Sequence, residues 1–423
     1  MILLLILVFI ICLLIRFPIA YAIAISCLVY IVINGIPIII LPLKMYSGID
    51  VFVLLSIPGF ILAGNLMNHG GITEKIIEFC NHLFGHVRGG LSLANIGASM
   101  LFAGISGTAV SDTASIGTVM IPAMKKEGYK ADYSCAVTAA SSTVGPIIPP
   151  SVPMIIAATL TGLSVGKLFL AGAIPGLLLG SGFIVVAYIV SKSQPHKRKP
   201  RSSVSEVLRG LSDTFWALLM TFIILFGIIG GYFTPTEASI VAVVYAALVG
   251  LFIYRKLKLK DIPRIVLDSV KTSSSLMILV GFSNLFGWIL VTEGLPDLIS
   301  ESLLGFTSNK IVILIFINLI LLMVGTFMET IAALLIMFPV LLNVAVEVGV
   351  DPIQFAVIAV LNLIIGLTTP PVGVCLFVAS SIGKISIDRI SIRILPFLLV
   401  SILVLILVTY IPQISLGLPG FFY

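Results

Sequence analysis

The sequence has very little charge, because Asp, Glu, Lys and Arg together make up 10% of its 423 residues, whereas hydrophobic residues make up 59%. A soluble core cannot bury that much apolar surface, so the composition excludes a soluble globular protein. Apolar stretches such as 214–231, 238–254 and 395–411 approach the roughly 20 residues that a helix needs to cross a bilayer. Polar and apolar residues do not alternate there, as they would in a membrane β-barrel. The chain is therefore predicted to be an all-α integral membrane protein.

Cysteine and histidine are also scarce. The cysteines stand singly, without a CxxC motif, at Cys12, Cys27, Cys80, Cys135 and Cys375. They indicate core packing and neither a disulfide nor a transition-metal site. No histidine lies in a membrane helix to serve as the base of a protease built on Gly104-Ile105-Ser106-Gly107, and the P-loop-like segment 162–167 is one residue short. We therefore expect no enzyme, no use of ATP and no cofactor.

The few charges are unevenly placed along the chain. Basic residues crowd the stretches 192–209 and 255–264, while the loop 233–237 between them has no Lys or Arg. By the positive-inside rule both basic stretches are cytoplasmic and that loop is outside. Because topology already explains the basic stretches, the expected partner is the bilayer and no nucleic acid.

Two apolar segments begin and end on the same side of the membrane by this rule. Basic residues flank 89–124 on both sides, whereas the polar stretches before and after 310–342 are acidic. Each segment is predicted to be a re-entrant hairpin, the first opening inward and the second outward.

The sequence repeats one unusual motif, Gly-x-x-x-Pro-Pro within an apolar stretch. Gly145 to Pro150 returns as Gly366 to Pro371, an offset of 221 (366 − 145). Proline interrupts a membrane helix, so the ranges 132–160 and 352–382 are predicted to be broken helices. Paired breaks of this kind indicate the central site of a secondary transporter.

Further pairs extend the repeat over the whole chain. Pro18 with Pro235, Asp112 with Glu329 and Pro122 with Pro339 share an offset of 217 (235 − 18), so one short insertion separates the two blocks. We expect a first repeat at 1–191, a cytoplasmic basic linker at 192–211 and a second repeat at 212–423. Each repeat then has five crossings plus one hairpin, and an odd number of crossings makes the second repeat inverted.

Three segments carry a family resemblance: 104–112, 140–154 and 362–373. They resemble the signature stretches of the large membrane subunit of tripartite ATP-independent periplasmic (TRAP) transporters. The resemblance implies an elevator-type transporter in the bacterial inner membrane that imports carboxylates, such as C4-dicarboxylates or sialic acids, together with Na⁺. It also implies two partners, a periplasmic binding protein and a small four-helix membrane subunit. We expect one copy of each membrane subunit per complex.

Broken helices expose backbone carbonyls that hydroxyl groups can join around Na⁺. The predicted sodium ligands are those next to the first break and hairpin tip, with symmetry mates in the second half: Ser106, Gly107, Ser141, Gly145, Gly325, Thr326, Gly366 and Thr369. Half-helix N-termini attract anions, and Ser151 and Gly373 follow the two breaks. The predicted substrate residues are these two and others in or beside the breaks: Ser142, Pro149, Pro150, Ser151, Thr368, Pro371 and Gly373.

The carboxylates of Asp112 and Glu329 have three possible roles, which are capping of freed amides, negative charge near Na⁺, and proton transfer. Amphipathic stretches 72–84 and 295–304 are expected to lie along the membrane as arms before the two hairpins. Two alternatives stay open for the function. One is a self-sufficient sodium/anion symporter without a binding protein, and the other is a channel.

Overall fold

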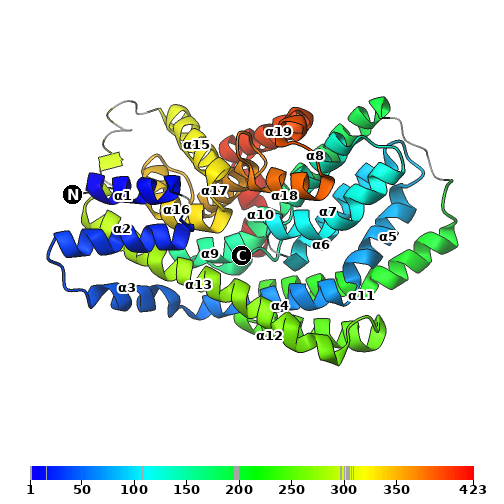
Figure 1. The fold of residues 1–423 in the computed structure, drawn as a ribbon, viewed down its shortest axis with the longest axis horizontal. Coiled ribbons are helices and arrows are strands. Elements are labelled where there is room, and N and C mark those ends of the chain that lie inside the picture. Colours follow the sequence, from blue (N-terminus) through cyan, green and yellow to red (C-terminus); the bar gives the residue numbers. More distant parts are fainter. Residues whose placement is uncertain are drawn as a thin grey trace.

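The fold is that of a computed structural model, which describes residues 2–15, 17–106, 108–194, 200–295, 298–299, 301, 305, 307 and 309–423. These residues form helices and connecting turns, with no strand among them (Figure 1). Eight described helices are long and apolar enough to cross a membrane. The prediction of an all-α membrane protein is therefore confirmed.

The first half, up to residue 193, contains twelve helical segments in the described residues. They are α1 Ile2–Leu14, α2 Ile19–Ile33, α3 Ile40–Ile49, η1 Phe52–Leu55, α4 Ser56–His69, α5 Ile72–Phe84, α6 Gly90–Ser106, α7 Ala109–Lys126, α8 Ala131–Ser142, α9 Val152–Thr161, α10 Val165–Val190 and η2 Ser191–Ser193.

The second half repeats the order of the long elements. Its described helices are α11 Val204–Ile229, α12 Pro235–Leu248, η3 Val249–Ile253, η4 Leu259–Asp261, α13 Ile262–Thr292, α15 Lys310–Phe327, α16 Thr330–Glu347, α17 Pro352–Gly366, α18 Val374–Gly383, α19 Ile387–Tyr410 and α20 Gln413–Phe422. Each half thus places a helical hairpin (α6/α7 or α15/α16) before an interrupted helix (α8/α9 or α17/α18).

Two helix starts in the second half are set by capping boxes. The Ser203 hydroxyl accepts from the Glu206 amide at 3.2 Å, and the Glu206 carboxylate accepts from the Ser203 amide at 2.7 Å. Thr234 and Glu237 form the same arrangement at the start of α12. Such a box satisfies two amides that a helix start leaves free. It makes α11 begin at Val204, inside the predicted linker 192–211, so α11 is a long helix whose first turns are polar.

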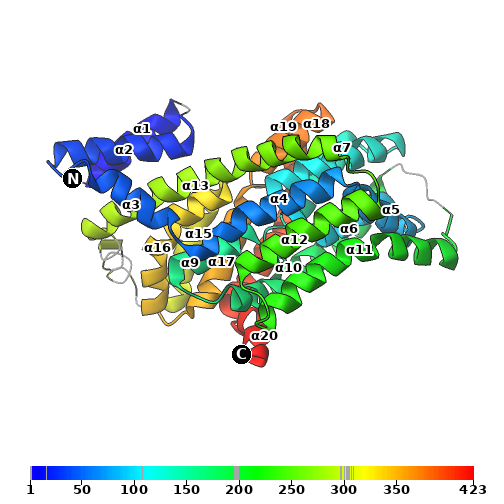
Figure 2. The ribbon, with the colours of Figure 1, turned by 90° about the horizontal axis from the view of Figure 1, so that it is seen from below.

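The helices separate into an outer layer and an inner block (Figures 1 and 2). We call α1–α4 and α11–α13 the outer layer, in which α4 packs against α12 and α13, and α2 packs against α13. We call α6–α10 and α15–α19 the inner block, in which α8 packs against α19 and α17 packs against α10. Each of these contacts between the halves has its equivalent with the halves interchanged, as expected when two repeats pack together around a pseudo-two-fold axis.

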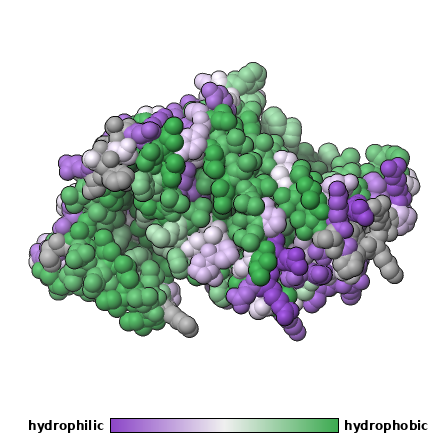
Figure 3. Space-filling view, turned by 90° about the horizontal axis from the view of Figure 1, so that it is seen from above, coloured by the Kyte–Doolittle hydropathy of each residue, from purple (hydrophilic) through white to green (hydrophobic). Residues whose placement is uncertain are grey.

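The surface follows the predicted topology. Apolar side chains cover much of the face in Figure 3, and polar side chains gather toward the end that holds α5 and the start of α11. That end carries the basic residues assigned to the cytoplasm, including Arg201 and Arg209, which flank the start of α11. Polar groups gathered at an end of the bundle, beyond the apolar face, fit a protein embedded in lipid.

The predicted arm at 72–84 is helix α5, with the same bounds. Its apolar face is buried against α6 and α11. Lys75 pairs with Glu78 and Asp213, both at 3.0 Å, and these two carboxylates raise the pKa of Lys75 above its ordinary value. Lys256 pairs with Glu74 at 2.8 Å. The arm is thus attached to the outer layer. The second predicted arm, 295–304, lies mostly outside the described residues.

Candidate functional site

Both broken helices are interrupted inside the inner block. Helix α8 ends at Ser142 and α9 begins at Val152, while α17 ends at Gly366 and α18 begins at Val374. The peptide bonds Pro149–Pro150 and Pro370–Pro371 are cis. The segment between α8 and α9 is buried apart from the half-buried Ile148, whereas the segment between α17 and α18 is exposed at Pro371. The backbone polar groups of the first interruption are therefore held away from lipid.

The first hairpin contacts the first break through a carboxylate. Asp112, in the first turns of α7, is fully buried, and its side chain lies against the backbone of Gly145. A β-carbon on Gly145 would overlap the Asp112 carboxylate and lie 3.3 Å from its Cγ. Glycine is therefore required for the carboxylate to approach the interrupted backbone.

The second hairpin contacts the second break through backbone atoms. A β-carbon on Gly366 would lie 2.5 Å from the Cα of Gly325 and 2.7 Å from its carbonyl oxygen. The Gly373 amide donates to the Thr326 carbonyl at 3.2 Å. Small residues allow this close approach between membrane helices. The structure thus brings together three of the second predicted set of sodium ligands, Gly325, Thr326 and Gly366.

Hydroxyl groups line α8 just before the first break. Ser99 of α6 donates to the Ser141 hydroxyl at 2.8 Å, and Ser141 and Ser142 donate to the Thr138 carbonyl at 3.1 and 2.7 Å. Asn95, one turn earlier on α6, donates to the Thr138 hydroxyl at 2.6 Å. Sequence reasoning did not select Asn95 and Ser99, although polar residues four apart on one helix face were visible there.

An asparagine takes the place of Ser141 in the second half. Asn362 follows Ser141 by 221 positions (362 − 141), and its amide donates to the Asn318 side chain at 2.8 Å. Asn318 in turn donates to the Thr409 hydroxyl at 3.1 Å. The side-chain oxygen of Asn362, Oδ1, is buried and has no hydrogen-bond partner within the described part of the chain. Sequence reasoning quoted Asn362 within a motif but did not select it.

The remaining predicted residues mostly serve the local turns. The hydroxyls of Thr368 and Thr369 donate to the Ile365 carbonyl at 3.0 and 2.9 Å. Ser151 caps α9, accepting from the Met154 amide at 3.2 Å and donating to the Pro146 carbonyl. Gly373 precedes α18 with a positive φ of 59°.

Two of the predicted residues are described incompletely or not at all. Ser106 ends α6 and only its backbone is described, and Gly107 lies outside the described residues. The first predicted set of sodium ligands is therefore placed only through Ser141 and Gly145.

Asp112 and Glu329 do not occupy equivalent positions. Glu329 caps α16, since its carboxylate accepts from the Ile331 and Ala332 amides at 2.9 and 3.3 Å. The residue before α7 is Thr108, whose hydroxyl accepts from the Ser111 amide at 3.4 Å. Helices α7 and α16 begin 221 residues apart (330 − 109), so the offset of 217 pairs the wrong residues here. The short insertion in the second half therefore lies before its hairpin. With the offset of 221, Glu329 corresponds to Thr108.

The polar atoms at the two breaks are mainly oxygen atoms. They include backbone carbonyls, hydroxyls and the carboxylates of Asp112 and Glu329, and neither 132–160 nor 352–382 contains Lys or Arg. Oxygen ligands suit hard cations such as Na⁺, and a nearby carboxylate adds negative charge. The arrangement thus gathers oxygen atoms of the kind that coordinate hard cations.

A cavity of about 300 Å³ lies between the first hairpin and the outer layer. Thr108 and Ser111 of the hairpin line it opposite Asn65 and Asn68 of α4. Asn68 donates to the Ser115 hydroxyl of α7 at 2.9 Å. Inner block and outer layer therefore meet at a partly polar surface next to the first break.

The sequence matches the family profile described as "Tripartite ATP-independent periplasmic transporter, DctM component" over residues 6–414. It is 42% identical over 379 residues to the sialic acid TRAP transporter large permease protein SiaM of Vibrio cholerae, covering 90% of this chain and 89% of that one. It is 40% identical over 380 residues to the C4-dicarboxylate TRAP transporter large permease protein DctM of Pseudomonas aeruginosa, with the same coverage.

A solved structure resembles the fold at low sequence identity. The YdaH transporter of Alcanivorax borkumensis, described as having an unusual topology, superposes with a TM-score of 0.58 at 14% identity. The alignment covers 90% of this chain and 88% of that one. At this identity the likeness concerns the fold alone.

Proposed function

Since this chain belongs to the DctM components of tripartite ATP-independent periplasmic transporters, and is a multi-pass protein of the bacterial inner membrane, we propose that it couples import of a small organic anion to Na⁺. The role of large permease subunit follows from membership of the family. Sodium coupling and the kind of anion are what we propose. The substrate passes through chemically unchanged, so the activity is transport and not catalysis.

The observation that carries the proposal is the Asp112 carboxylate against Gly145. A buried carboxylate beside an interrupted membrane helix favours a cation at that place, because it adds negative charge where backbone carbonyls leave the helical hydrogen-bond pattern. Ser141 and the carbonyls around Gly145 would complete one sodium site. Gly325, Thr326, Gly366 and Thr369 would supply a second.

The substrate is proposed to be a carboxylate. The relatives named above are described as permeases for sialic acid and for C4-dicarboxylates, both of which are carboxylates. Ser151 and Gly373 directly precede α9 and α18, whose N-terminal amides and dipoles favour an anion, and Ser142 and Thr368 lie at the opposite ends of the two interruptions.

Two partner proteins complete the proposed transporter. A periplasmic binding protein delivers the anion, and a small four-helix membrane subunit enlarges the outer layer, with one copy of each membrane subunit. The inner block then moves against the outer layer as an elevator, carrying both breaks and both hairpins together.

Uptake by proteoliposomes tests the coupling. With small subunit and binding protein present, uptake should rise sigmoidally with external Na⁺, because both sites must fill before the block moves. Asp112→Asn should raise the half-saturating Na⁺ concentration at least about tenfold, since a charge-assisted interaction contributes about 1.5–3 kcal/mol. Asp268→Asn, at an exposed carboxylate of α13, is the matched control.

Each failure of this experiment has its own meaning. Uptake that is indifferent to Na⁺ would defeat the coupling. Full uptake without the binding protein would favour the self-sufficient symporter, and uptake that never saturates would favour a channel.

A further inference from the structure

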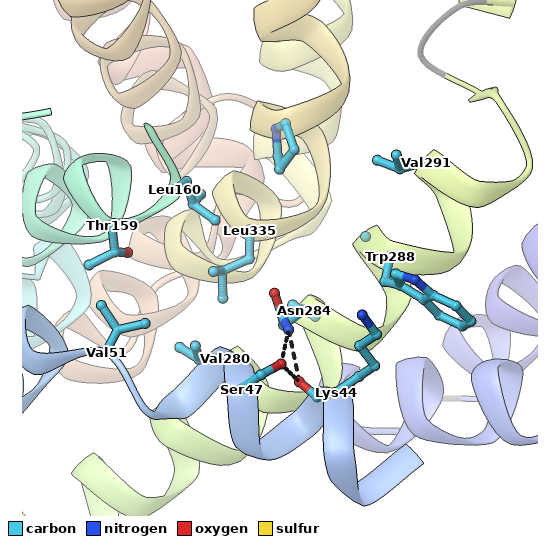
Figure 4. Close-up of a pocket in the computed structure, with 14 residues that line it drawn as sticks. Lys44, Ser47, Val51, Thr159, Leu160, Val280, Asn284, Trp288, Val291 and Leu335 are labelled. Carbon is cyan, nitrogen blue, oxygen red and sulfur yellow. Dashed lines mark hydrogen bonds between the residues drawn. The ribbon is translucent and has the colours of Figure 1, made fainter. Parts of the chain in front are cut away.

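A second cavity, of about 480 Å³, lies between the outer layer and the inner block (Figure 4). Lys44, Ser47 and Val51 come from α3 and the turn after it, and Val280 to Val291 come from α13. Thr159 and Leu160 of α9 and Leu335 and Pro339 of α16 form the opposite wall. Because Glu293 follows α13 on the side assigned to the periplasm, the cavity lies toward that side.

Lys44 is the one charged side chain among the described residues that line this cavity. Its ammonium group lies over the ring of Trp288, with Nζ 5.1 Å from the ring centroid. It forms no ion pair with any described carboxylate. A cation held against an aromatic face, without a counter-ion, retains its capacity to bind an anion.

Neutral polar residues line the same cavity as Lys44. The Asn284 amide donates to the Lys44 carbonyl at 2.8 Å and to the Ser47 hydroxyl at 3.4 Å, which fixes α3 against α13. Ser283 also lines the cavity and is 2% exposed, yet its hydroxyl has no hydrogen-bond partner among the described residues. A buried hydroxyl without a partner costs about 1–3 kcal/mol unless something else supplies the bond. Because the hydroxyl oxygen is itself buried, a ligand in the cavity would supply this bond once the Ser283 side chain turns toward it.

We propose that this cavity is an entry site for the carboxylate substrate, with Lys44 and Ser283 binding the carboxylate and Trp288 packing against the body of the molecule. The proposal rests on the proposed function, since it assumes that a small organic anion is imported. The cavity volume suits such a molecule. The wall that α9 and α16 provide belongs to the inner block, so block movement would change the cavity and pass the anion inward.

The chain offers its own reporter for this site. It contains two tryptophans, and Trp216 lies on α11, away from the cavity. Trp216→Phe leaves Trp288 as the single tryptophan. In phosphatidylcholine nanodiscs, with the small subunit and without the binding protein, N-acetylneuraminate or succinate should change Trp288 fluorescence in a saturable way.

Lys44→Gln is the decisive variant, and Lys167→Gln is its matched control. Lys167 is equally half-buried and also lies over an aromatic ring, with Nζ 5.3 Å from the centroid of Tyr423, but it does not line the cavity. Lys44→Gln should weaken the fluorescence response and raise the apparent KM for uptake about tenfold, which is about 1.4 kcal/mol. Lys167→Gln should leave both unchanged.

Ser283→Ala separates binding from folding. It should weaken the response severalfold without lowering the thermal unfolding temperature, because the hydroxyl supports no contact among the described residues. Retained binding in Ser283→Ala would remove Ser283 from the site.

Several results would overturn the entry site. One is an uptake KM that is the same in Lys44→Gln and Lys167→Gln. Another is a fluorescence change with phosphatidylglycerol nanodiscs but with neither soluble anion, which would assign the cavity to a lipid headgroup. Absence of uptake in the unmodified protein with every anion would instead defeat the proposed function.

Discussion

Two glycines at the breaks are needed for different physical reasons. Gly145 leaves room for the carboxylate of Asp112, a side chain that can move, whereas Gly366 leaves room for the backbone of Gly325, which cannot. An added methyl group at Gly366 must therefore separate α15 from α17. At Gly145 it need only displace a carboxylate. The two positions are equivalent in the repeat but not in their contacts.

The first prediction compares alanine at these two positions. Gly366→Ala should lower stability by about 1–3 kcal/mol, the usual cost of overpacking, and reduce the amount of folded protein. Gly145→Ala should keep its thermal unfolding temperature near that of the unmodified protein but lose most sodium-dependent uptake. Gly417→Ala, where an added β-carbon meets no atom within 4 Å, is the control for both measurements. Undiminished uptake in Gly145→Ala would place the sodium site elsewhere.

The sequence was informative about these residues because Gly and Pro mark breaks wherever they interrupt an apolar run. It did not reveal Asn362, whose importance depends on contacts with Asn318 and thereby Thr409 on two other helices. It also paired Asp112 with Glu329 from a numerical offset, and one insertion before the hairpins made that offset misleading.

At the scale of elements, hairpin α15/α16 depends on a cap supplied by Glu329. Its carboxylate accepts from two amides of the first turn of α16, where no water is available to replace it within a membrane. Hairpin α6/α7 has a threonine at the corresponding position. Only in the second hairpin, therefore, does a charged side chain cap the returning helix, α16.

The second prediction separates capping from charge. Glu329→Ala should destabilise the protein by about 1 kcal/mol, whereas Glu329→Gln, which keeps an oxygen acceptor, should cost much less. Thermal unfolding gives the stability, and hydrogen exchange at Ile331 and Ala332 locates the change. If Glu329→Gln lost sodium-dependent uptake as fully as Glu329→Ala, the negative charge and not the cap would be the important property.

The element boundaries depend on two kinds of sequence signal. The hairpin segments were predicted from flanking charges, because the positive-inside rule acts on short loops and needs no tertiary information. The early start of α11 was missed because a capping box in a basic, polar stretch resembles a linker until its two hydrogen bonds are seen.

At the scale of the whole molecule, an odd number of crossings in each repeat makes the second repeat inverted. The number of crossings was deduced from where the charged residues lie along the sequence. The cavity around Lys44 does not follow from it. Lys44 and Asn284 are 240 positions apart, and only the packing of α3 on α13 brings them together. A lysine in a short apolar helix is an unremarkable residue by itself, so the sequence alone did not point to the anion site that we propose.

The last prediction concerns the charge that the whole molecule moves in one cycle. If two Na⁺ accompany each anion, a monoanion such as N-acetylneuraminate carries one net positive charge inward (2 − 1), while a dianion such as succinate carries none (2 − 2). An interior potential of −100 mV contributes about 2.3 kcal/mol per net charge, so it should speed initial uptake of the monoanion by up to about 50-fold. The dianion should be unaffected. Valinomycin-clamped proteoliposomes with both partners present, at fixed Na⁺, provide the measurement, and an equal response to both anions would contradict a stoichiometry of two.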